Sequence, residues 1–206
     1  MNNRSNSIVN RVGSVEGKLG ILMATAKTGS FYLTQTVSLP ATSAPSARVT
    51  ATVDLSAYVN VPTGQAIAIE SVDFVYQYGP NYSSAVSAML AVGNNGALQA
   101  QLTDLNPSTV FVRADNHSLI ASGALNIDQV NNIGTQHSDL YPDNFGPANL
   151  SEAFLVVNDT LYLTGGVDAA TTGAEINYIS VRIRCRVVKL NTKDWMAIAI
   201  QSTAEA

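Results

Sequence analysis

Period-two alternation is the feature that most constrains the fold of this chain. Beyond residue 27, apolar and polar residues alternate along much of the sequence, most clearly over 176–190. One face of this segment is apolar and the other carries three arginines: Ile179, Val181, Ile183, Cys185 and Val187 on the first, Arg182, Arg184 and Arg186 on the second. Because successive side chains of a strand point to opposite faces, the segment predicts a β-strand with a core face and an arginine face.

Similar patterns predict further strands, at residues 31–39, 49–55, 67–78, 84–92, 97–103, 109–113, 118–121, 153–163 and 195–201. Within the long segment 67–78, the apolar phase shifts near Ser71, which predicts a β-bulge or a bend. Asn-Gly at positions 95–96 predicts a hairpin between its flanking strands. Residues 125–150 lack clear periodicity and predict a long loop, and a second loop is expected over 165–173.

The resulting nine or ten strands favour an all-β fold, a two-sheet jelly-roll sandwich with an N-terminal arm. An immunoglobulin-like sandwich is the alternative, although the Cys-Trp-Cys spacing of that fold is absent. A chain of 206 residues fits one such domain. We therefore expect an arm over residues 1–27 and a sandwich over residues 28–206.

The arm differs from the rest of the chain. Its apolar residues recur at steps of four and three, as on one stripe of a helix: Ile8, Val12, Val15, Leu19, Leu22 and Ala26. Its cations Arg4, Arg11 and Lys18 recur every seven residues on a neighbouring face. Three glycines weaken such a helix, so we expect it to form when docked on a surface.

Charge is sparse and unevenly placed. Charged residues make up 13% of the chain, against about a quarter in typical globular domains, which suits a surface covered by neighbours. The net charge is -4. Residues 1–27 hold four cations, ending at Lys27, and one acid; residues 28–181 hold two cations and twelve acids; residues 182–193 hold five cations and no acid. Two basic zones therefore flank an acidic body, which points to a polyanionic partner for those zones.

No catalytic signature is recognisable. The two histidines, His117 and His137, lie in polar segments without metal-ligand spacing, and no nucleophile elbow or phosphate-binding glycine loop occurs. The single cysteine, Cys185, excludes an intrachain disulfide and is expected in the core. We expect no enzyme activity, no cofactor, no metal and no small-molecule substrate. No stretch approaches the roughly 20 apolar residues of a transmembrane helix, so a soluble or peripheral protein is expected.

The basic arm, the charge-poor body of strands and the irregular segment 125–150 together resemble the single jelly-roll capsid proteins of icosahedral viruses. The resemblance implies a virion protein, assembled in the host cytoplasm, whose subunits form a shell with themselves and with any other capsid proteins. It also implies an arm along the inner shell surface, where Arg4, Arg11, Lys18 and Lys27 would face a membrane or the genome. The apolar stripe Ile8, Val12, Val15, Leu19 and Leu22 would then pack on neighbouring subunits or on a lipid surface.

Two readings of the arginine strip remain open. Arg182, Arg184 and Arg186 could face the same side as the arm and contact anions there, or they could form salt bridges to acids of an adjacent strand or subunit, which we favour slightly. A different class of function is a binding module, such as a tail, adhesin or carbohydrate-binding sandwich, which would be extracellular. That class predicts a concave patch of exposed aromatic residues.

Overall fold

Two antiparallel sheets form the body of the protein. The computed structural model describes residues 24–138 and 154–203. The strands and helices follow one another in the chain as β1 (Thr25–Ala26), β2 (Phe31–Leu39), β3 (Arg48–Asp54), η1 (Val61–Thr63), β4 (Gln65–Tyr78), η2 (Val86–Ala88), β5 (Asn95–Thr103), β6 (Leu119–Asp128), β7 (Ile133–Ser138), β8 (Phe154–Val156), β9 (Thr160–Asp168), β10 (Asn177–Lys189) and α1 (Thr192–Thr203).

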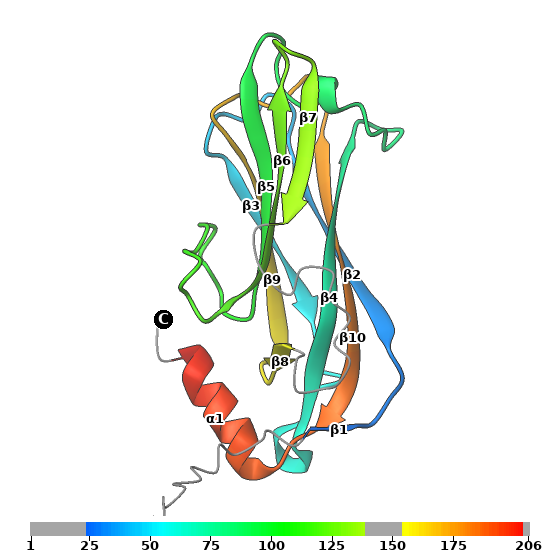
Figure 1. The fold of residues 1–206 in the computed structure, drawn as a ribbon, viewed down its shortest axis with the longest axis vertical. Helices are drawn as coiled ribbons and strands as arrows, with labels where there is room; N and C mark the ends of the chain where they lie inside the picture. The colour runs from blue at the N-terminus through cyan, green and yellow to red at the C-terminus, as the bar shows by residue number, and fades with distance from the viewer. Residues whose placement is uncertain (1–23, 139–153, 204–206) are drawn as a thin grey trace, which may run out of the picture.

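The strand order is that of a jelly roll. Sheet A has the order β2-β10-β4-β8, with β1 pairing to β10 beyond the end of β2. Sheet B has the order β3-β9-β5-β6-β7. The first long strand, β2, therefore lies beside the last, β10, and the chain crosses between sheets from β2 to β3, from β4 to β5 and from β8 through β9 to β10 (Figure 1). The prediction of an all-β jelly-roll sandwich is confirmed.

The core fills the space between the two sheets. Fully buried side chains come from both, among them Leu39, Ile67 and Ile179 of sheet A and Leu98 and Leu163 of sheet B. In β10, the predicted apolar face points into this core, since Ile179, Val181, Ile183, Cys185 and Val187 are all buried. The arginines therefore project from the outer face of sheet A.

A β-bulge in β4 explains the phase shift of its sequence. Arg184 of β10 lies opposite Ser71, but the next residue, Cys185, lies opposite Ile69, so Glu70 is the extra residue. Ile67 and Ile69 point into the core on one side of the bulge, and Val72 and Phe74 do so on the other. The predicted bulge is confirmed, and one strand thereby keeps its apolar residues on the core face along its whole length.

The predicted hairpin is wrong. Residues 84–92 form no strand but contain the short helix η2, and β5 pairs with β6 and β9 instead. The side-chain amide of Gln129 binds the turn: its Oε1 accepts from Gly93 N (2.6 Å) and Asn94 N (3.2 Å). Its Nε2 donates to the carbonyl oxygens of Ser87 (2.6 Å) and Leu90 (3.1 Å).

The long loop predicted over 125–150 is also wrong in its first part, because β6 continues to Asp128 and β7 follows at 133–138. The pattern missed β7 because its residues 133–136 are all exposed and therefore show no buried face. The predicted strand at 109–113 is instead part of the loop 104–118. The Gln101 side chain holds this loop on sheet B through both the N–H (2.8 Å) and the C=O (3.0 Å) of Val112.

The C-terminal segment Trp195–Gln201 is helical, not a strand. Its alternation hid a second pattern, since Trp195, Ile198 and Ala199 also fit one helical stripe and pack on sheet A. The start signal was Asn191, whose Oδ1 accepts from Asp194 N at 2.9 Å in the manner of an N-cap. The predicted loop over 165–173 begins later than expected, because Gly165 and Gly166 belong to β9.

Candidate functional site

The arginine strip on the outer face of sheet A is the most distinctive chemical feature of the described residues. Arg184 Nε lies 3.0 Å from Glu70 Oε2, and Arg186 pairs with Oε1 of the same carboxylate. The side-chain hydroxyl of Ser30 donates to both carboxylate oxygens, at 3.0 and 2.9 Å. Glu70 is only 2% exposed. The acid that compensates these two arginines thus comes from the adjacent strand β4 of the same chain.

Arg182 is placed differently from its two neighbours. Its guanidinium carbon lies 5.1 Å from the centre of the Tyr32 ring, within the range of a cation–π contact. Asp73 of β4 is opposite Arg182 in the strand register. Among the residues that the structure describes, three guanidinium groups thus share this face with two carboxylates, Glu70 and Asp73, so the strip keeps a positive surplus.

The described end of the arm joins the same strand. Lys27 N donates to Val187 O (2.8 Å), and the hydroxyl of Thr28 accepts from Val187 N (3.0 Å). Ala26, the last member of the predicted helical stripe, lies in strand β1 and is exposed, so the helical prediction is wrong at that position. Lys27 is exposed. The other arm residues singled out from the sequence lie outside the described residues: Arg4, Ile8, Arg11, Val12, Val15, Lys18, Leu19 and Leu22.

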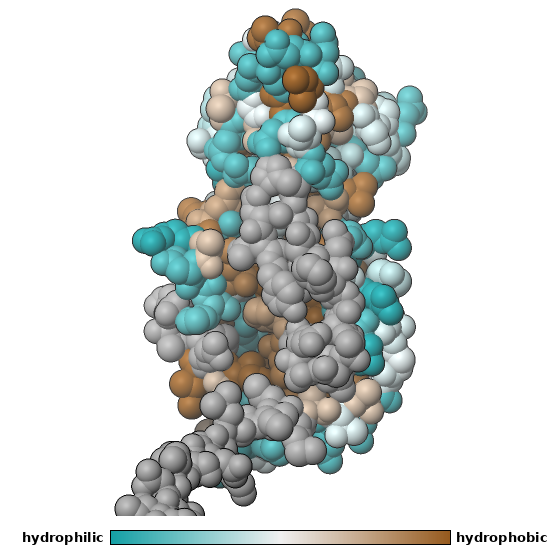
Figure 2. Space-filling view, in the orientation of Figure 1, coloured by the Kyte–Doolittle hydropathy of each residue, from teal (hydrophilic) through white to brown (hydrophobic). Residues whose placement is uncertain are grey.

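Helix α1 adds an apolar surface that the strand pattern did not predict. It packs on a small second core, formed by Ala66, Ala68, Val157, Val188 and Leu190 on the outer side of sheet A. Between α1 and η1 lies a groove of about 800 Å³. Met196 (54% exposed) and Ile200 (62% exposed) leave hydrophobic surface on the helix itself, and Figure 2 shows such surface in this part of the molecule.

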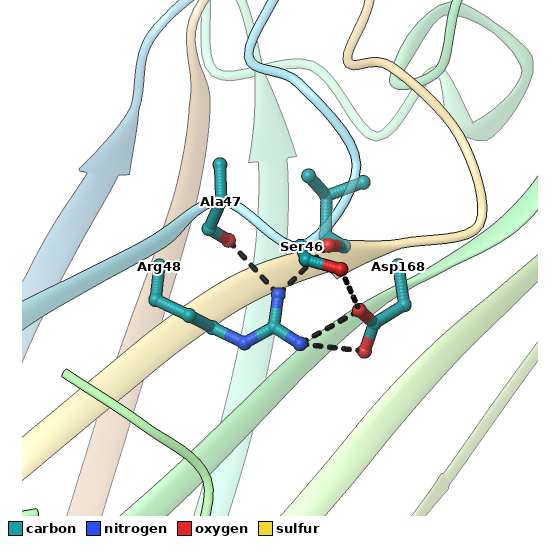
Figure 3. Close-up of polar contacts among 5 residues, drawn as sticks. Ser46, Ala47, Arg48 and Asp168 are labelled. Carbon is teal, nitrogen blue, oxygen red and sulfur yellow. Dashed lines mark hydrogen bonds and ion pairs between the residues drawn. The ribbon is translucent and has the colours of Figure 1, made fainter.

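Arg48 is one of only two cations between residues 28 and 181, and its side chain is held by contacts within the same chain (Figure 3). Its Nη2 lies 2.7 and 2.8 Å from the two carboxylate oxygens of Asp168, and its Nη1 donates to the carbonyl oxygens of Ala47 and Val167. The guanidinium also lies 4.3 Å from the centre of the Phe111 ring. Arg48 therefore fastens the loop 104–118 to sheet B.

Two ionisable side chains in the described core, Cys185 and Asp104, have raised pKa values. Burial, and then the charge of Glu70, raise the pKa of Cys185 to about 12, which keeps the thiol protonated and unreactive. Burial raises the pKa of Asp104 to about 6. The side-chain amide Nδ2 of Asn158 lies 3.4 Å from Asp104 Oδ2. No His, Cys, Asp and Glu side chains gather in threes to hold a metal ion within the described ranges.

Exposed aromatic residues are few on the described surface. Tyr32 is 55% exposed beneath Arg182, and Tyr82 is 57% exposed with its ring 5.1 Å from that of Tyr178. His117 is exposed in the loop before β6. In residues 24–138 and 154–203, no helix has the length and apolar character needed to cross a bilayer.

Comparison with known proteins adds little to the geometry. No protein-family model matches the sequence, and no curated protein matches it significantly. Among the solved structures that match, one described as Desmodium yellow mottle tymovirus aligns over 92% of this chain and 97% of its own, at 7% identity and a TM-score of 0.29. A superposition this loose does not establish a relationship between the two proteins.

Proposed function

We propose that this protein is a structural virion subunit that assembles with copies of itself into an icosahedral shell. The observation that carries the proposal is the attachment of the basic arm to the arginine strand. Lys27 and Thr28 bind the backbone of β10 at Val187, next to Arg186. The described end of the first basic zone therefore lies beside the second on sheet A, which supports a subunit with an inner and an outer side.

The distribution of acids supports the same polarity. Of the described acids between residues 28 and 181, Glu70 and Asp73 belong to β4, whereas the other seven lie in sheet B or in loops: Asp54, Asp104, Asp115, Asp128, Asp159, Asp168 and Glu175. In the proposed shell, the outer face of sheet A points inward with the arm. The arm contacts neighbouring subunits together with an inner membrane or the genome, through Arg4, Arg11, Lys18 and Lys27.

Exposed apolar residues at the loop end of the sandwich support contacts between subunits. Val92 is 97% exposed, Val130 70% and Ile133 53%. All three lie in or beside the turns that precede β5 and connect β6 to β7, where Figure 2 shows hydrophobic surface among hydrophilic loop residues. On a surface so poor in charge, such residues favour burial against a neighbour. The proposed role is structural and involves no catalysis.

Particle formation by the purified full chain tests the proposal. Negative-stain microscopy and sedimentation should show closed particles of uniform size. A variant with Arg4, Arg11 and Lys18 replaced by Gln should lose co-sedimentation with either anionic vesicles or nucleic acid, and whichever is lost identifies the layer beneath the shell. A protein that stays monomeric at high concentration and binds glycans would contradict the proposal.

A binding module is the second candidate, favoured by one observation. Tyr32 and the Tyr82–Tyr178 pair place aromatic rings on or beside the outer face of sheet A, and such rings can stack on sugars. Binding of a glycan that is lost in a Tyr82→Ala variant, without any particle formation, would favour this function over the shell.

A further inference from the structure

The groove between η1 and α1 lies at the end of sheet A. Its lining is largely apolar, yet the groove is open to solvent. Its described lining includes Val61 and Pro62 from η1, Leu190 from the connection after β10, and Trp195 and Met196 from α1. Val61 is 60% exposed and Met196 54%. Exposed apolar side chains that converge on one groove lose unfavourable contact with water when a second apolar segment fills it.

The described chain begins at this groove. Ala24 packs on the same small core as Trp195. In β1, Thr25 lies opposite Lys189 and Ala26 opposite Val188, in antiparallel register. Continued backwards, that register leads from Ala24 towards Leu190, Asn191 and Thr192, all of which line the groove together with Lys189.

We infer that the groove is the docking site for the apolar end of the chain's own N-terminal arm, residues 19–23. This segment reads Leu-Gly-Ile-Leu-Met. A five-residue segment spans at most roughly 18 Å when extended, and it starts directly at Ala24, so the groove is within reach without any intervening linker. The inference does not rest on the proposed shell, because docking of this kind takes place within a single subunit.

The chain offers a direct reporter of docking. Trp195 is the only tryptophan in the sequence and lines the groove, whereas residues 1–23 contain no aromatic residue. Its indole Nε1 is buried and has no hydrogen-bond partner among the described residues. The tryptophan fluorescence of the full chain therefore comes from this groove only. The residues of the arm add no fluorescence of their own.

Two pairs of variants test the inference in the full chain, in the subunit fraction isolated by gel filtration. In the arm, Leu19→Asp with Leu22→Asp removes the apolar side chains, and Asn10→Asp with Ser14→Asp adds the same charge farther from the groove. In the groove, Val61→Asp places a charge on η1, and Val110→Asp does so at a similarly exposed site, 57% exposed, in the loop 104–118. Circular dichroism and urea unfolding show that each variant retains its fold.

The expected result is a red shift of Trp195 emission and stronger quenching by acrylamide in the Leu19/Leu22 and Val61 variants, with neither effect in the two controls. Unchanged emission and quenching in the Leu19/Leu22 variant would overturn the inference. Quenching that rises on dilution of the wild-type subunit would also overturn it, because the occupant would then be the arm of another copy. Particle formation is measured separately, so failure of the docking and failure of the shell proposal are distinguishable.

Discussion

Glu70 and Arg184 form an ion pair at the β-bulge of β4, where Glu70 is the extra residue and has no direct partner in the register of β10. Arg184 is opposite Ser71 across the sheet, yet its Nε lies 3.0 Å from Glu70 Oε2. The extra residue of the bulge is a carboxylate on the outer face of sheet A, where Arg186 also binds it. One backbone irregularity thus keeps the core phase of β4 and provides the acid that the arginine strip requires.

Replacement of Glu70 by Gln should lower the free energy of unfolding by about 1–3 kcal/mol, since it removes two charge-assisted contacts and leaves two arginines close together. The partial exposure of both arginine side chains, 45% and 28%, limits the loss. Asp73→Asn is the matched control on the same strand and should change stability by less than about 0.5 kcal/mol. Urea unfolding measures both, and equal effects would contradict the role assigned to Glu70.

Gln129, in the turn after β6, binds residues 87–94 of the connection between β4 and β5 through four hydrogen bonds of its side-chain amide. Gln129→Ala should cost about 1 kcal/mol, because the partly buried carbonyl of Leu90 and three exposed backbone groups lose their partner. Hydrogen exchange should accelerate at the amides of Gly93 and Asn94. Val130→Ala, at a 70% exposed neighbour, is the control. Unchanged protection of those two amides in Gln129→Ala would show that the turn holds without this side chain.

Asp104 should make stability fall as the pH rises. Its pKa is about 6 in the folded protein against an ordinary value of 3.8, so the folded state holds the proton more tightly than the unfolded state. Between pH 3.8 and about 6, ionisation therefore favours unfolding, by up to about 3 kcal/mol in total. Above pH 6 the loss is complete, and below pH 3.8 it is absent.

Asp104→Asn removes this ionisation, so the variant should be more stable than the wild type at pH 7 and similar to it near pH 4. Urea unfolding at several pH values measures the difference between the two proteins. That difference, rather than either curve alone, is the informative quantity, because hydrogen bonds to Ser56 and Asn131 lower the pKa of Asp54 and Asp128 and act in the opposite direction. Parallel curves for the two proteins would contradict the prediction.

Elements with one buried face could be predicted from the sequence. The strands β2 and β10, the end of β3 and the part of β4 after its bulge alternate because one side meets the core and the other is more exposed, and even the bulge at Glu70 left a visible phase shift. Alternation was a weaker guide where both faces of a strand share one environment. In β6, whose outer face is also covered from Leu119 to Leu125, the pattern predicted a strand only over 118–121. Its partner β7 was missed because its residues 133–136 are all exposed.

The candidate site was only partly predictable for a related reason. The arginine face follows from periodicity, but its compensating acid Glu70 is more than one hundred residues away and depends on strand pairing. The groove depends on α1, whose short apolar run fits both a helix and a strand. The N-cap at Asn191 was the signal that could have separated the two.

The final prediction concerns Gly166, which leaves room for Arg48 above sheet B. A Cβ at Gly166 would meet Arg48 Nη1 at 2.7 Å and Nε at 2.8 Å. Gly166→Ala should therefore displace the guanidinium from Asp168 and Phe111 and cost about 1–3 kcal/mol. Gly29→Ala is the control, because a Cβ there meets nothing within 4 Å.

A double-mutant cycle separates this mechanism from a general effect of the added methyl group. If the cost of Gly166→Ala arises from Arg48, it should largely disappear in an Arg48→Ala background, because no guanidinium remains to be displaced. Urea unfolding of the four proteins gives the coupling free energy between the two positions. Additive losses would mean that the methyl group disturbs β9 itself, and that Arg48 is not the reason for a glycine at position 166.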